Sequence, residues 1–227
     1  MPTLLAIVAA RNEADRIGAT LDALAQTFPG SHLWVADDAS EDSTSEVALV
    51  HGARLVSRGR PHGKGGNMTA AAEAALSDEA SAAADLVLVC DGDLGATAAQ
   101  LRDLVDAVDA GDYDLAVAAF SNRVGGGFGV ALRFARWAIE SRCGYRAQAP
   151  ISGQRAMRAE VLRAVLPFAP SYGMEIGMTI DAVRAGFRVG EIELDLEHRA
   201  TGRTLSGFRH RGRQMRDFTR VWLARRR

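Results

Sequence analysis

The first 120 residues alternate apolar runs with amphipathic segments, and this order limits the possible folds more than any other feature of the chain. The runs expected to form strands cover residues 3–10, 33–36, 53–57, 86–90 and 115–120. The first run is apolar almost without interruption, as a strand buried on both faces of a parallel sheet requires. Between the runs, apolar residues recur at helical spacing. The sequence therefore predicts an α/β fold with a doubly wound, mostly parallel sheet flanked by helices.

The pattern changes after residue 120. A glycine-rich segment covers 121–129, and segment 144–153 is expected to be irregular. Helices are expected over 130–141, 161–166, 174–185 and 207–223, with one more strand over 188–196. Neither a repeat nor a linker interrupts the chain, so we expect a single domain of residues 1–227.

Composition excludes several classes of protein. The chain has 227 residues, of which 48% are hydrophobic and 24% charged, and this is typical of a globular protein. Two cysteines, Cys90 and Cys143, exclude a disulfide scaffold. No apolar run reaches the ~18 residues of a membrane-spanning helix. The apolar N-terminus ends at Arg11 without a signal-peptide pattern, so we expect a cytoplasmic protein.

The charge is distributed unevenly along the chain. Residues 199–227 hold ten arginines and one acid, Asp217, for a net charge of +9, and the rest of the chain carries −10. A basic segment on an acidic body indicates a phosphate-bearing partner, such as an anionic lipid, a nucleotide, a phosphorylated metabolite or nucleic acid. The alternative is a solvated helix end, where arginine is favourable.

The most informative motif is Asp91-Gly92-Asp93, which directly follows the apolar run 86–90. In open α/β sheets, ligands bind beyond the carboxyl ends of the strands. Two carboxylates beside a glycine can hold a hard divalent cation there, which neutralises a diphosphate. The alternative is a solvated turn, because Asp and Gly are common turn residues.

Asp37 and Asp38 follow the second apolar run in the same way. A carboxylate at this edge can accept a hydrogen bond from the imide N–H of uracil or from guanine. Helix capping is a second role for this segment, in which Ser40 or Asp42 would be the N-cap of the helix expected around Glu46.

Ala10-Arg11-Asn12-Glu13 follows the first run. We expect Asn12 to cap the next helix and Glu13 to lie in its first turn, where a negative charge is favourable. The functional alternative is that this turn and Glu13 line a nucleotide pocket.

Two glycine-rich segments remain. Segment 58–67 is basic, is expected to be a loop leading into a helix, and holds Lys64, the single lysine of the chain. Such loops suit phosphate, because backbone N–H groups and a lysine converge on it, although the spacing is not that of a P-loop. Segment 125–129 lies far from the first strand–helix turn, where a dinucleotide fingerprint belongs, so we expect a loop that closes over substrate.

The last motif surrounds His198, which lies at the end of the expected strand 188–196. His198 can serve as a metal ligand. Arg199 and Arg203, on either side of a glycine turn, can bind phosphate.

Together these segments resemble the family-2 glycosyltransferases of GT-A fold. The resemblance covers nearly the whole chain and is carried by A-A-R-N-E at 9–13, V-A-D-D-A-S at 35–40, G-K-G at 63–65 and V-C-D-G-D-L at 89–94. M-E-I-G at 174–177, with H-R at 198–199, looks like glucosyl-3-phosphoglycerate synthase. I-S-G-Q-R-A at 151–156 and R-A-T-G-R-T at 199–204 look like dolichyl- or polyprenyl-phosphate sugar transferases.

Two departures from these patterns concern the acceptor. Arg203-Thr204 stands where the lipid-linked enzymes often carry a Ser-Lys pair. Gly153-Gln154-Arg155 stands where the phosphoglycerate enzymes carry Gly-Glu-Tyr.

The resemblance implies a Rossmann-like GT-A fold with a nucleotide-sugar-binding half at 1–120 and an acceptor-side half at 121–227. It also implies a role for each matching residue. The residues that would contact the nucleotide sugar are Ala10, Asn12, Glu13, Asp38, Lys64, Asp91 and Gly92. The metal would be bound by Asp91, Asp93 and His198. The acceptor or the diphosphate would be contacted by Arg199 and Arg203. Asp93 and Glu175 are the catalytic candidates, and Glu175 would touch the donor sugar and act as base towards a hydroxyl acceptor.

The implied reaction moves a sugar from a nucleoside-diphosphate sugar, with UDP favoured, to a phosphate-bearing acceptor such as polyprenyl phosphate or 3-phosphoglycerate. It uses Mg²⁺ or Mn²⁺. We also expect the Arg-rich C-terminus to contact anionic membrane at its inner face, and the sequence leaves a homodimer open. The alternatives are a nucleotidyltransferase on a related fold and a non-catalytic binder of nucleotide or nucleic acid, although no nucleic-acid partner is expected.

Overall fold

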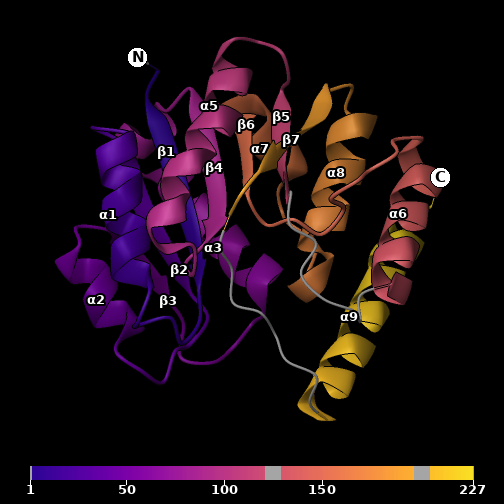
Figure 1. Cartoon of the computed structure of the whole chain (residues 1–227), viewed down its shortest axis with the longest axis horizontal. Coiled ribbons are helices and arrows are strands. Elements are labelled where there is room, and N and C mark those ends of the chain that lie inside the picture. The colour runs from indigo at the N-terminus through magenta and orange to yellow at the C-terminus, as the bar shows by residue number, and fades with distance from the viewer. Residues whose placement is uncertain (1, 121–128, 197–204, 227) are drawn as a thin grey trace.

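The computed structural model describes residues 2–120, 129–196 and 205–226. Its strands form a single seven-stranded sheet, in the order β3-β2-β1-β4-β6-β5-β7 (Figure 1). They are β1 (Leu4–Ala10), β2 (His32–Asp37), β3 (Arg54–Ser57), β4 (Leu86–Asp91), β5 (Leu115–Phe120), β6 (Arg155–Arg158) and β7 (Val189–Leu194). All neighbouring pairs are parallel except those of β6, which is antiparallel to both β4 and β5.

The helices follow the strands in alternation through most of the described chain. They are α1 (Ile17–Thr27), α2 (Thr44–Val50), α3 (Lys64–Ser77), α4 (Glu79–Ala82), α5 (Arg102–Asp109), α6 (Gly129–Cys143), α7 (Ala159–Val165), α8 (Met174–Arg184) and α9 (Leu205–Ala224). Two 3₁₀ segments, η1 (Gly95–Leu101) and η2 (Ser171–Gly173), lie before α5 and α8. None of these helices, within the described residues, is long and apolar enough to cross a membrane.

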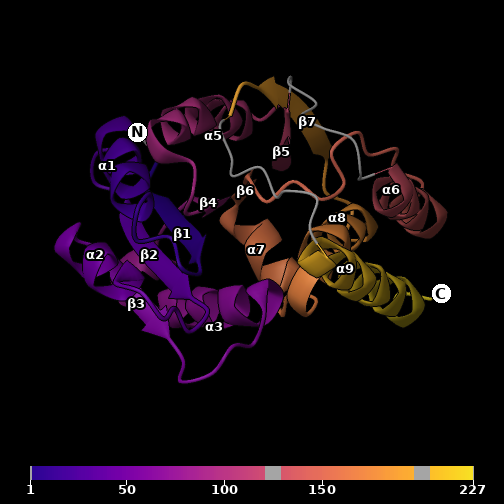
Figure 2. The same ribbon diagram turned by 60° about the horizontal axis from the view of Figure 1, so that its bottom comes forward.

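The alternating side chains of the central strands divide the core into two layers. In β1, Leu4, Ala6 and Val8 pack with α1 and α5, and Leu5 and Ile7 pack with α3, α7 and α8. Figure 2 shows α1 and α5 on one side of the sheet and α3 and α7 on the other. This covering of both faces explains the nearly continuous apolar runs in the strands.

A third apolar cluster forms a flank beside the sheet. It joins α6, α8 and α9 through Ile139, Ile176, Ile180, Phe218 and Val221, all of which are buried. The amphipathic helix expected at the C-terminus is therefore confirmed, and α9 packs on α6 and α8.

The expected strands agree with the structure to within two residues, and so does the doubly wound order. Three details of the prediction are wrong. Strand β6 was not expected, and the segment 58–67 is not all loop, because α3 begins at Lys64. Helix α1 begins at Ile17, which leaves Asn12 and Glu13 in the preceding turn and away from a capping role.

Candidate active site

The carboxyl ends of β1 and β4 meet where the order of the strands reverses, which is where ligands bind in open α/β sheets. Asp91 pairs in register with Ala9, and the Gly92 N–H donates to the carbonyl of Ala9 at 2.9 Å. A Cβ on Gly92 would lie 3.2 Å from that oxygen, which is tighter than an ordinary contact, so glycine suits this turn. The fold thus brings Ala10, Asp91 and Gly92 to one edge of the sheet.

Lys64 joins two carboxylates at this edge. Its Nζ lies 2.5 Å from Asp91 Oδ1 and 3.0 Å from Glu175 Oε1. The exposed fractions of the three side chains are 23% for Lys64, 33% for Asp91 and 8% for Glu175. Burial alone would lower the pKa of Lys64, but the two carboxylates outweigh it and raise the pKa above its ordinary value. A permanent ammonium ion therefore lies at the centre of the edge.

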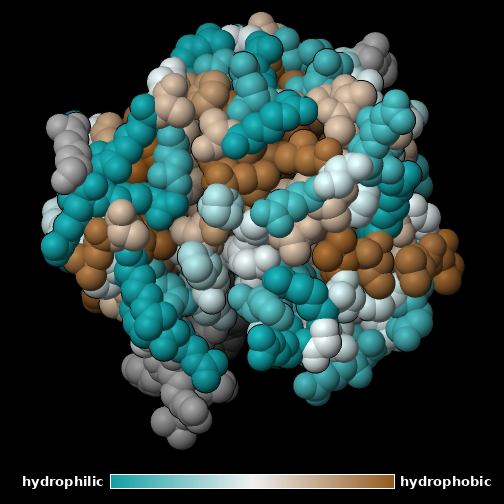
Figure 3. All heavy atoms as spheres, turned by 180° about the vertical axis from the view of Figure 1, so that it is seen from behind, coloured by the Kyte–Doolittle hydropathy of each residue, from teal (hydrophilic) through white to brown (hydrophobic). Residues whose placement is uncertain are grey.

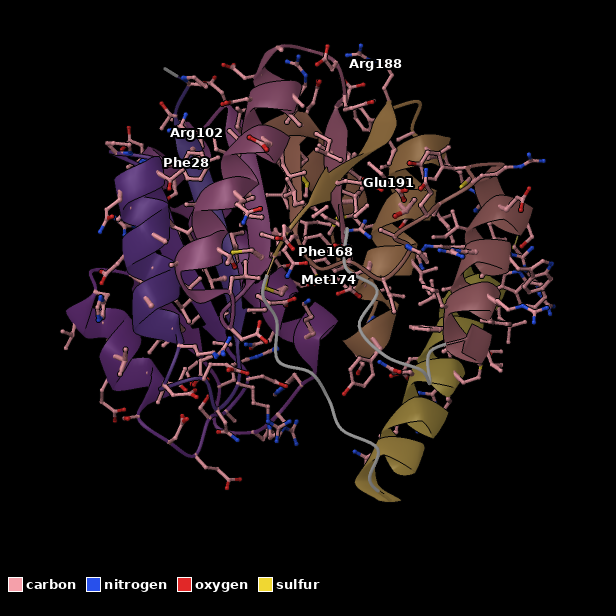
Figure 4. The ribbon with its side chains drawn as sticks, in the orientation of Figure 1. Phe28, Arg102, Phe168, Met174, Arg188 and Glu191 are labelled. Atoms are coloured by element: carbon pink, nitrogen blue, oxygen red, sulfur yellow. The ribbon has the colours of Figure 1, made fainter. Side chains whose placement is uncertain are left out.

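Close packing at the start of α3 explains how Lys64 reaches Glu175. A Cβ on Gly65 would collide with the carbonyl oxygen of Ala169 and lie 3.3 Å from the Cβ of Met174. The first turn of α3 is therefore pressed against the segment that leads into α8. Figure 4 shows Phe168 and Met174, on either side of this segment, near the centre of the molecule.

Asp38 holds the loop that precedes Lys64. Its carboxylate accepts the backbone N–H of His62 at 2.7 Å and that of Gly63 at 3.1 Å, and Arg11 Nη1 lies 3.9 Å from it. Gly63 has a φ of 75°, which favours glycine. Asp38 thus positions the lysine loop, and its contact with a base stays a prediction.

Asp37 has a different role from its neighbour. It is buried, and its carboxylate accepts hydrogen bonds from the hydroxyls of Ser40, Ser45 at 2.9 Å and Ser57 at 3.0 Å. These serines come from the ends of β2 and β3 and from α2, so Asp37 ties the three together. The N-cap expected at Ser40 or Asp42 is wrong, because α2 begins one residue after Ser43, although the Asp42 carboxylate accepts the Thr44 N–H at 3.0 Å.

The turn after β1 is tied to the turn after β2. Asn12 has a φ of 55°, donates its N–H to Ser40 Oγ at 2.9 Å and accepts the Glu41 N–H at 2.8 Å. The Glu13 N–H donates to Thr44 Oγ1 at 2.9 Å. The capping role expected for Asn12 is thus wrong because its side chain is bound across to the neighbouring turn, while its place beside the strand ends agrees with a nucleotide pocket.

The sequence pattern described as "Glycosyl transferase family 2" matches residues 5–165, which is most of the chain. The chain belongs to glycosyl transferase family 2.

The similar proteins within the family include two kinds of enzyme. The chain is 30% identical over 218 residues to a glucosyl-3-phosphoglycerate synthase of Mycolicibacterium paratuberculosis, covering 87% of this chain but 66% of that enzyme, just under two thirds of its length. It is 28% identical over 215 residues to an undecaprenyl-phosphate mannosyltransferase of Micrococcus luteus, covering 88% of this chain and 85% of that enzyme.

Solved structures agree over almost the whole chain. The glucosyl-3-phosphoglycerate synthase of Mycobacterium tuberculosis, in complex with phosphoglyceric acid, superposes with a TM-score of 0.78 at 26% identity, covering 99% of this chain and 80% of that one. The same enzyme with Mn²⁺, uridine diphosphate and glucosyl-3-phosphoglycerate gives a TM-score of 0.76. The GT-A fold expected from the resemblance is thereby confirmed.

The D-G-D turn of this family 2 chain is held from α1. Arg16 Nη1 donates to the Asp93 carbonyl at 3.1 Å, and Thr20 Oγ1 donates to the Gly92 carbonyl at 2.8 Å. Sequence reasoning missed both residues, because their contacts with the turn join segments more than 70 residues apart in the sequence.

The carboxylates of the turn suit a hard divalent cation. Asp91 and Asp93 offer carboxylate oxygens, and such ions are commonly bound by one or two carboxylates together with substrate phosphates and water. Among residues 2–120, 129–196 and 205–226, no three His, Cys, Asp or Glu side chains could hold an ion by themselves. The donor set therefore fits a cation shared with a phosphate ligand.

Several expected site residues lie outside the described part of the chain. These are His198, Arg199 and Arg203, and the same holds for residues 125–128 of the loop expected to close over substrate. Their roles stay predictions.

Proposed function

We propose that this chain transfers a sugar from a nucleoside-diphosphate sugar, a UDP-sugar in the first instance, to a phosphate-bearing acceptor, with Mg²⁺ or Mn²⁺ as cofactor. The observation that carries the proposal is Lys64, which lies between Asp91 and Glu175 at the carboxyl edge of β1 and β4. The names of the relatives support it, because both kinds of enzyme have phosphate-bearing acceptors or products. Family membership favours sugar transfer over the two alternatives, nucleotidyl transfer and nucleic-acid binding.

In the proposed site, Asp91 and Asp93 hold the cation, joined by His198. A cation bound there would supply positive charge to offset the charge that develops on the leaving diphosphate. Lys64 adds a fixed positive charge to the same region. Glu13 and Asp38 lie at the base side, Ala10, Asn12 and Gly92 complete the nucleotide contacts, and Arg199 and Arg203 bind the acceptor or diphosphate.

Glu175 is the candidate for contact with the donor sugar. Its carboxylate is largely buried and bound to Lys64, so it can accept a hydrogen bond from a sugar hydroxyl. A phosphate oxygen is already ionised and attacks without a general base, whereas a hydroxyl acceptor would require Glu175 as base.

We further propose that the acceptor is reached at the cytoplasmic face of an anionic membrane, through the flank formed by α6 and α9. Trp137 is 49% exposed, its ring lies 5.1 Å from that of Trp222, and the Arg142 guanidinium lies 4.0 Å over Trp222. Tryptophan beside arginine is typical of surfaces that bind the lipid headgroup region. Figure 3 shows long hydrophilic side chains over the edge where α9 lies, with hydrophobic atoms between them.

Part of the basic charge on α9 is neutralised within the protein. Arg225 forms a double ion pair with Asp181, and Arg216 and Arg220 lie 3.3 and 3.9 Å from Asp217. Truncation before α9 would also remove Phe218 and Val221 and expose the apolar residues of α6 and α8 that they cover, so it is a poor test. Co-sedimentation of Trp137→Ser with phosphatidylglycerol vesicles is sharper. We expect weaker binding than that of the unaltered chain, and equal binding would contradict the membrane proposal.

The function itself is tested by transfer. We would incubate the chain with UDP-glucose or GDP-mannose and Mn²⁺, and offer 3-phosphoglycerate or undecaprenyl phosphate as acceptor. The proposal predicts release of the nucleoside diphosphate that depends on both metal and acceptor. A folded chain that binds nucleotide sugar but transfers to neither acceptor would contradict the acceptor class.

A further inference from the structure

Asp91 is held by a side chain to which the family resemblance gives no role. Gln154, at 2% exposed, lies directly before β6 and donates its Nε2 amide to Asp91 Oδ2 at 2.8 Å. Lys64 Nζ lies 2.5 Å from the other oxygen, Oδ1. The carboxylate is therefore bound on both oxygens, and its orientation is fixed before any ligand arrives.

Ser152 bonds the end of the Gln154 amide that faces away from Asp91. The Ser152 hydroxyl, itself buried, donates to Gln154 Oε1 at 3.2 Å. A glutamine amide has one accepting oxygen and one donating nitrogen. Because the Asp91 carboxylate can only accept, the NH₂ group is directed at Asp91, and the serine hydroxyl, which can donate or accept, donates to the oxygen.

The backbone between these residues closes one side of the site. A Cβ on Gly153 would lie 2.6 Å from Asp91 Oδ2 and nearer still to Lys64 Nζ. A side chain at position 153 would therefore have to displace the ion pair. Segment 152–154 is thus in direct contact with both charged groups.

Arg155 connects this segment to the helix that carries Glu175. Its side chain is 1% exposed, Nε donates to the Ser152 carbonyl at 2.9 Å, and Nη1 donates to Thr179 Oγ1 at 2.9 Å. The Thr179 hydroxyl in turn donates to the Glu175 carbonyl at 3.0 Å. Burial lowers the pKa of Arg155 to about 10, opposed by Glu175 and Glu191, so the guanidinium stays charged at neutral pH.

The other end of the segment is held from β7. Glu191, labelled in Figure 4, accepts the backbone N–H of Gln148 at 2.8 Å and that of Ala149 at 3.0 Å. The segment 148–154 is irregular, yet it is bound at both ends. The Gln154 amide is therefore carried by a segment that is anchored on both sides.

We propose that Gln154 is a positioning residue, whose amide, set by Ser152 and Arg155, holds the Asp91 carboxylate ready for the divalent cation and the donor diphosphate. The inference rests on the proposed function, since it assigns Asp91 to the cation. Outer partners of metal-binding groups commonly tune the affinity for the metal rather than the chemistry.

The test is Gln154→Met, which keeps the length of the side chain and removes the amide. We would titrate Mn²⁺ against the protein with a fixed concentration of UDP and follow the melting temperature or heat of binding. We expect the apparent affinity for Mn²⁺ to fall about 10–100-fold. In the transfer assay the Mn²⁺ concentration for half-maximal rate should rise equally, while kcat at saturating Mn²⁺ stays close to that of the unaltered chain.

Gln148→Met is the matched control, because it makes the same substitution at an exposed side chain of the same segment. It should keep the Mn²⁺ response of the unaltered chain. Ser152→Ala is a second and milder variant, in which the amide loses its hydrogen bond to the serine but keeps that to Asp91. We expect it to weaken Mn²⁺ about 2–10-fold, the effect of one hydrogen bond.

A folded Gln154→Met variant with an unchanged Mn²⁺ response would overturn the inference. If that variant does not fold, Ser152→Ala decides, and an unchanged response there would overturn it as well. An unaltered chain that binds no UDP with any metal would contradict the proposed function and this inference together. If the unaltered chain binds UDP with Mn²⁺ and Gln154→Met binds them with the same affinity, the inference would be contradicted and the proposed function would stand.

Discussion

The carboxyl edge of the sheet and the α6–α9 flank are held by different forces. At the edge, the turns after β1, β2 and β4 are joined by hydrogen bonds and ion pairs around Asp37, Asp38 and Asp91. On the flank, α9 is held mainly by the burial of Phe218 and Val221 against α6 and α8.

This contrast separates binding from stability. Polar contacts contribute modestly to net stability but fix the orientation of the side chains that they join. Apolar burial contributes strongly to stability and orients side chains much less. Substitutions at the edge should therefore change ligand binding more than folding, and substitutions on the flank should do the opposite.

The largest expected effect is that of Lys64→Met at the edge. Removing the ammonium leaves Asp91 and Glu175 to repel each other and takes a positive charge from the diphosphate site. We expect kcat/KM for sugar transfer to fall about 10²–10³-fold, the usual effect of losing one group that stabilises developing charge. Arg60→Met, an exposed cation of the same loop, is the control and should retain activity. Full activity in Lys64→Met would contradict the assignment.

Phe218→Ala tests the flank. The side chain is 1% exposed, and its loss should destabilise the fold by about 3–5 kcal/mol, measured by urea or thermal unfolding. The folded fraction should bind UDP with the affinity of the unaltered chain. Leu223→Ala, at an exposed position of α9, should cost less than about 0.5 kcal/mol. A large loss of UDP affinity in folded Phe218→Ala would break the contrast between the two regions.

Asp37→Asn sharpens the comparison within the edge itself. Because its carboxylate accepts from three serine hydroxyls, the substitution should lower the free energy of unfolding by about 1–3 kcal/mol. Asp38→Asn should affect nucleotide affinity more than stability, since it holds the loop before Lys64. Urea unfolding should show the larger loss of stability in Asp37→Asn, and UDP titration should show the larger loss of affinity in Asp38→Asn. If one variant showed the larger loss in both measurements, separate roles for the two residues would be contradicted.

The smallest effect is expected at the opposite edge, where β5 begins. Hydrogen bonds from the Arg188 guanidinium, at 2.9 Å, lower the pKa of Asp114. A carboxyl whose pKa is lowered in the folded state stabilises the protein above about pH 4. This stabilisation is lost as the pH falls through the pKa of the folded state. Asp114→Asn should therefore remove about 1 kcal/mol at neutral pH and flatten the loss of stability in acid. Exposed Asp109→Asn is the control, and an acid profile of Asp114→Asn parallel to that of the unaltered chain would contradict the prediction.

The sequence predicted the sheet well because long apolar runs leave little choice of structure. It missed β6, since Arg155–Arg158 is only four residues long and has arginine at both ends. It placed the start of α3 too late, because glycine is unfavourable in helices, whereas the contact of Gly65 with Ala169 overrides that preference.

The site was predictable in part for a similar reason. Asp91 and Lys64 stand in recognisable motifs, and Glu175 follows from the resemblance. Gln154, Arg16 and Thr20 could not be chosen, because their contacts with Asp91 and the D-G-D turn depend on how distant segments are placed by the sheet.

The central claim is that the edge around Asp91 and Asp93 is a metal-dependent nucleotide site. The most direct measurement is the thermal shift produced by UDP- and GDP-sugars, with and without Mn²⁺ or Mg²⁺, on the unaltered chain and on Asp93→Ala. A ligand that binds only the native state raises the melting temperature. The account predicts a metal-dependent shift with one nucleotide that is lost in Asp93→Ala. A folded chain that shows no shift with any nucleotide sugar, or the same shift in both proteins, would contradict it.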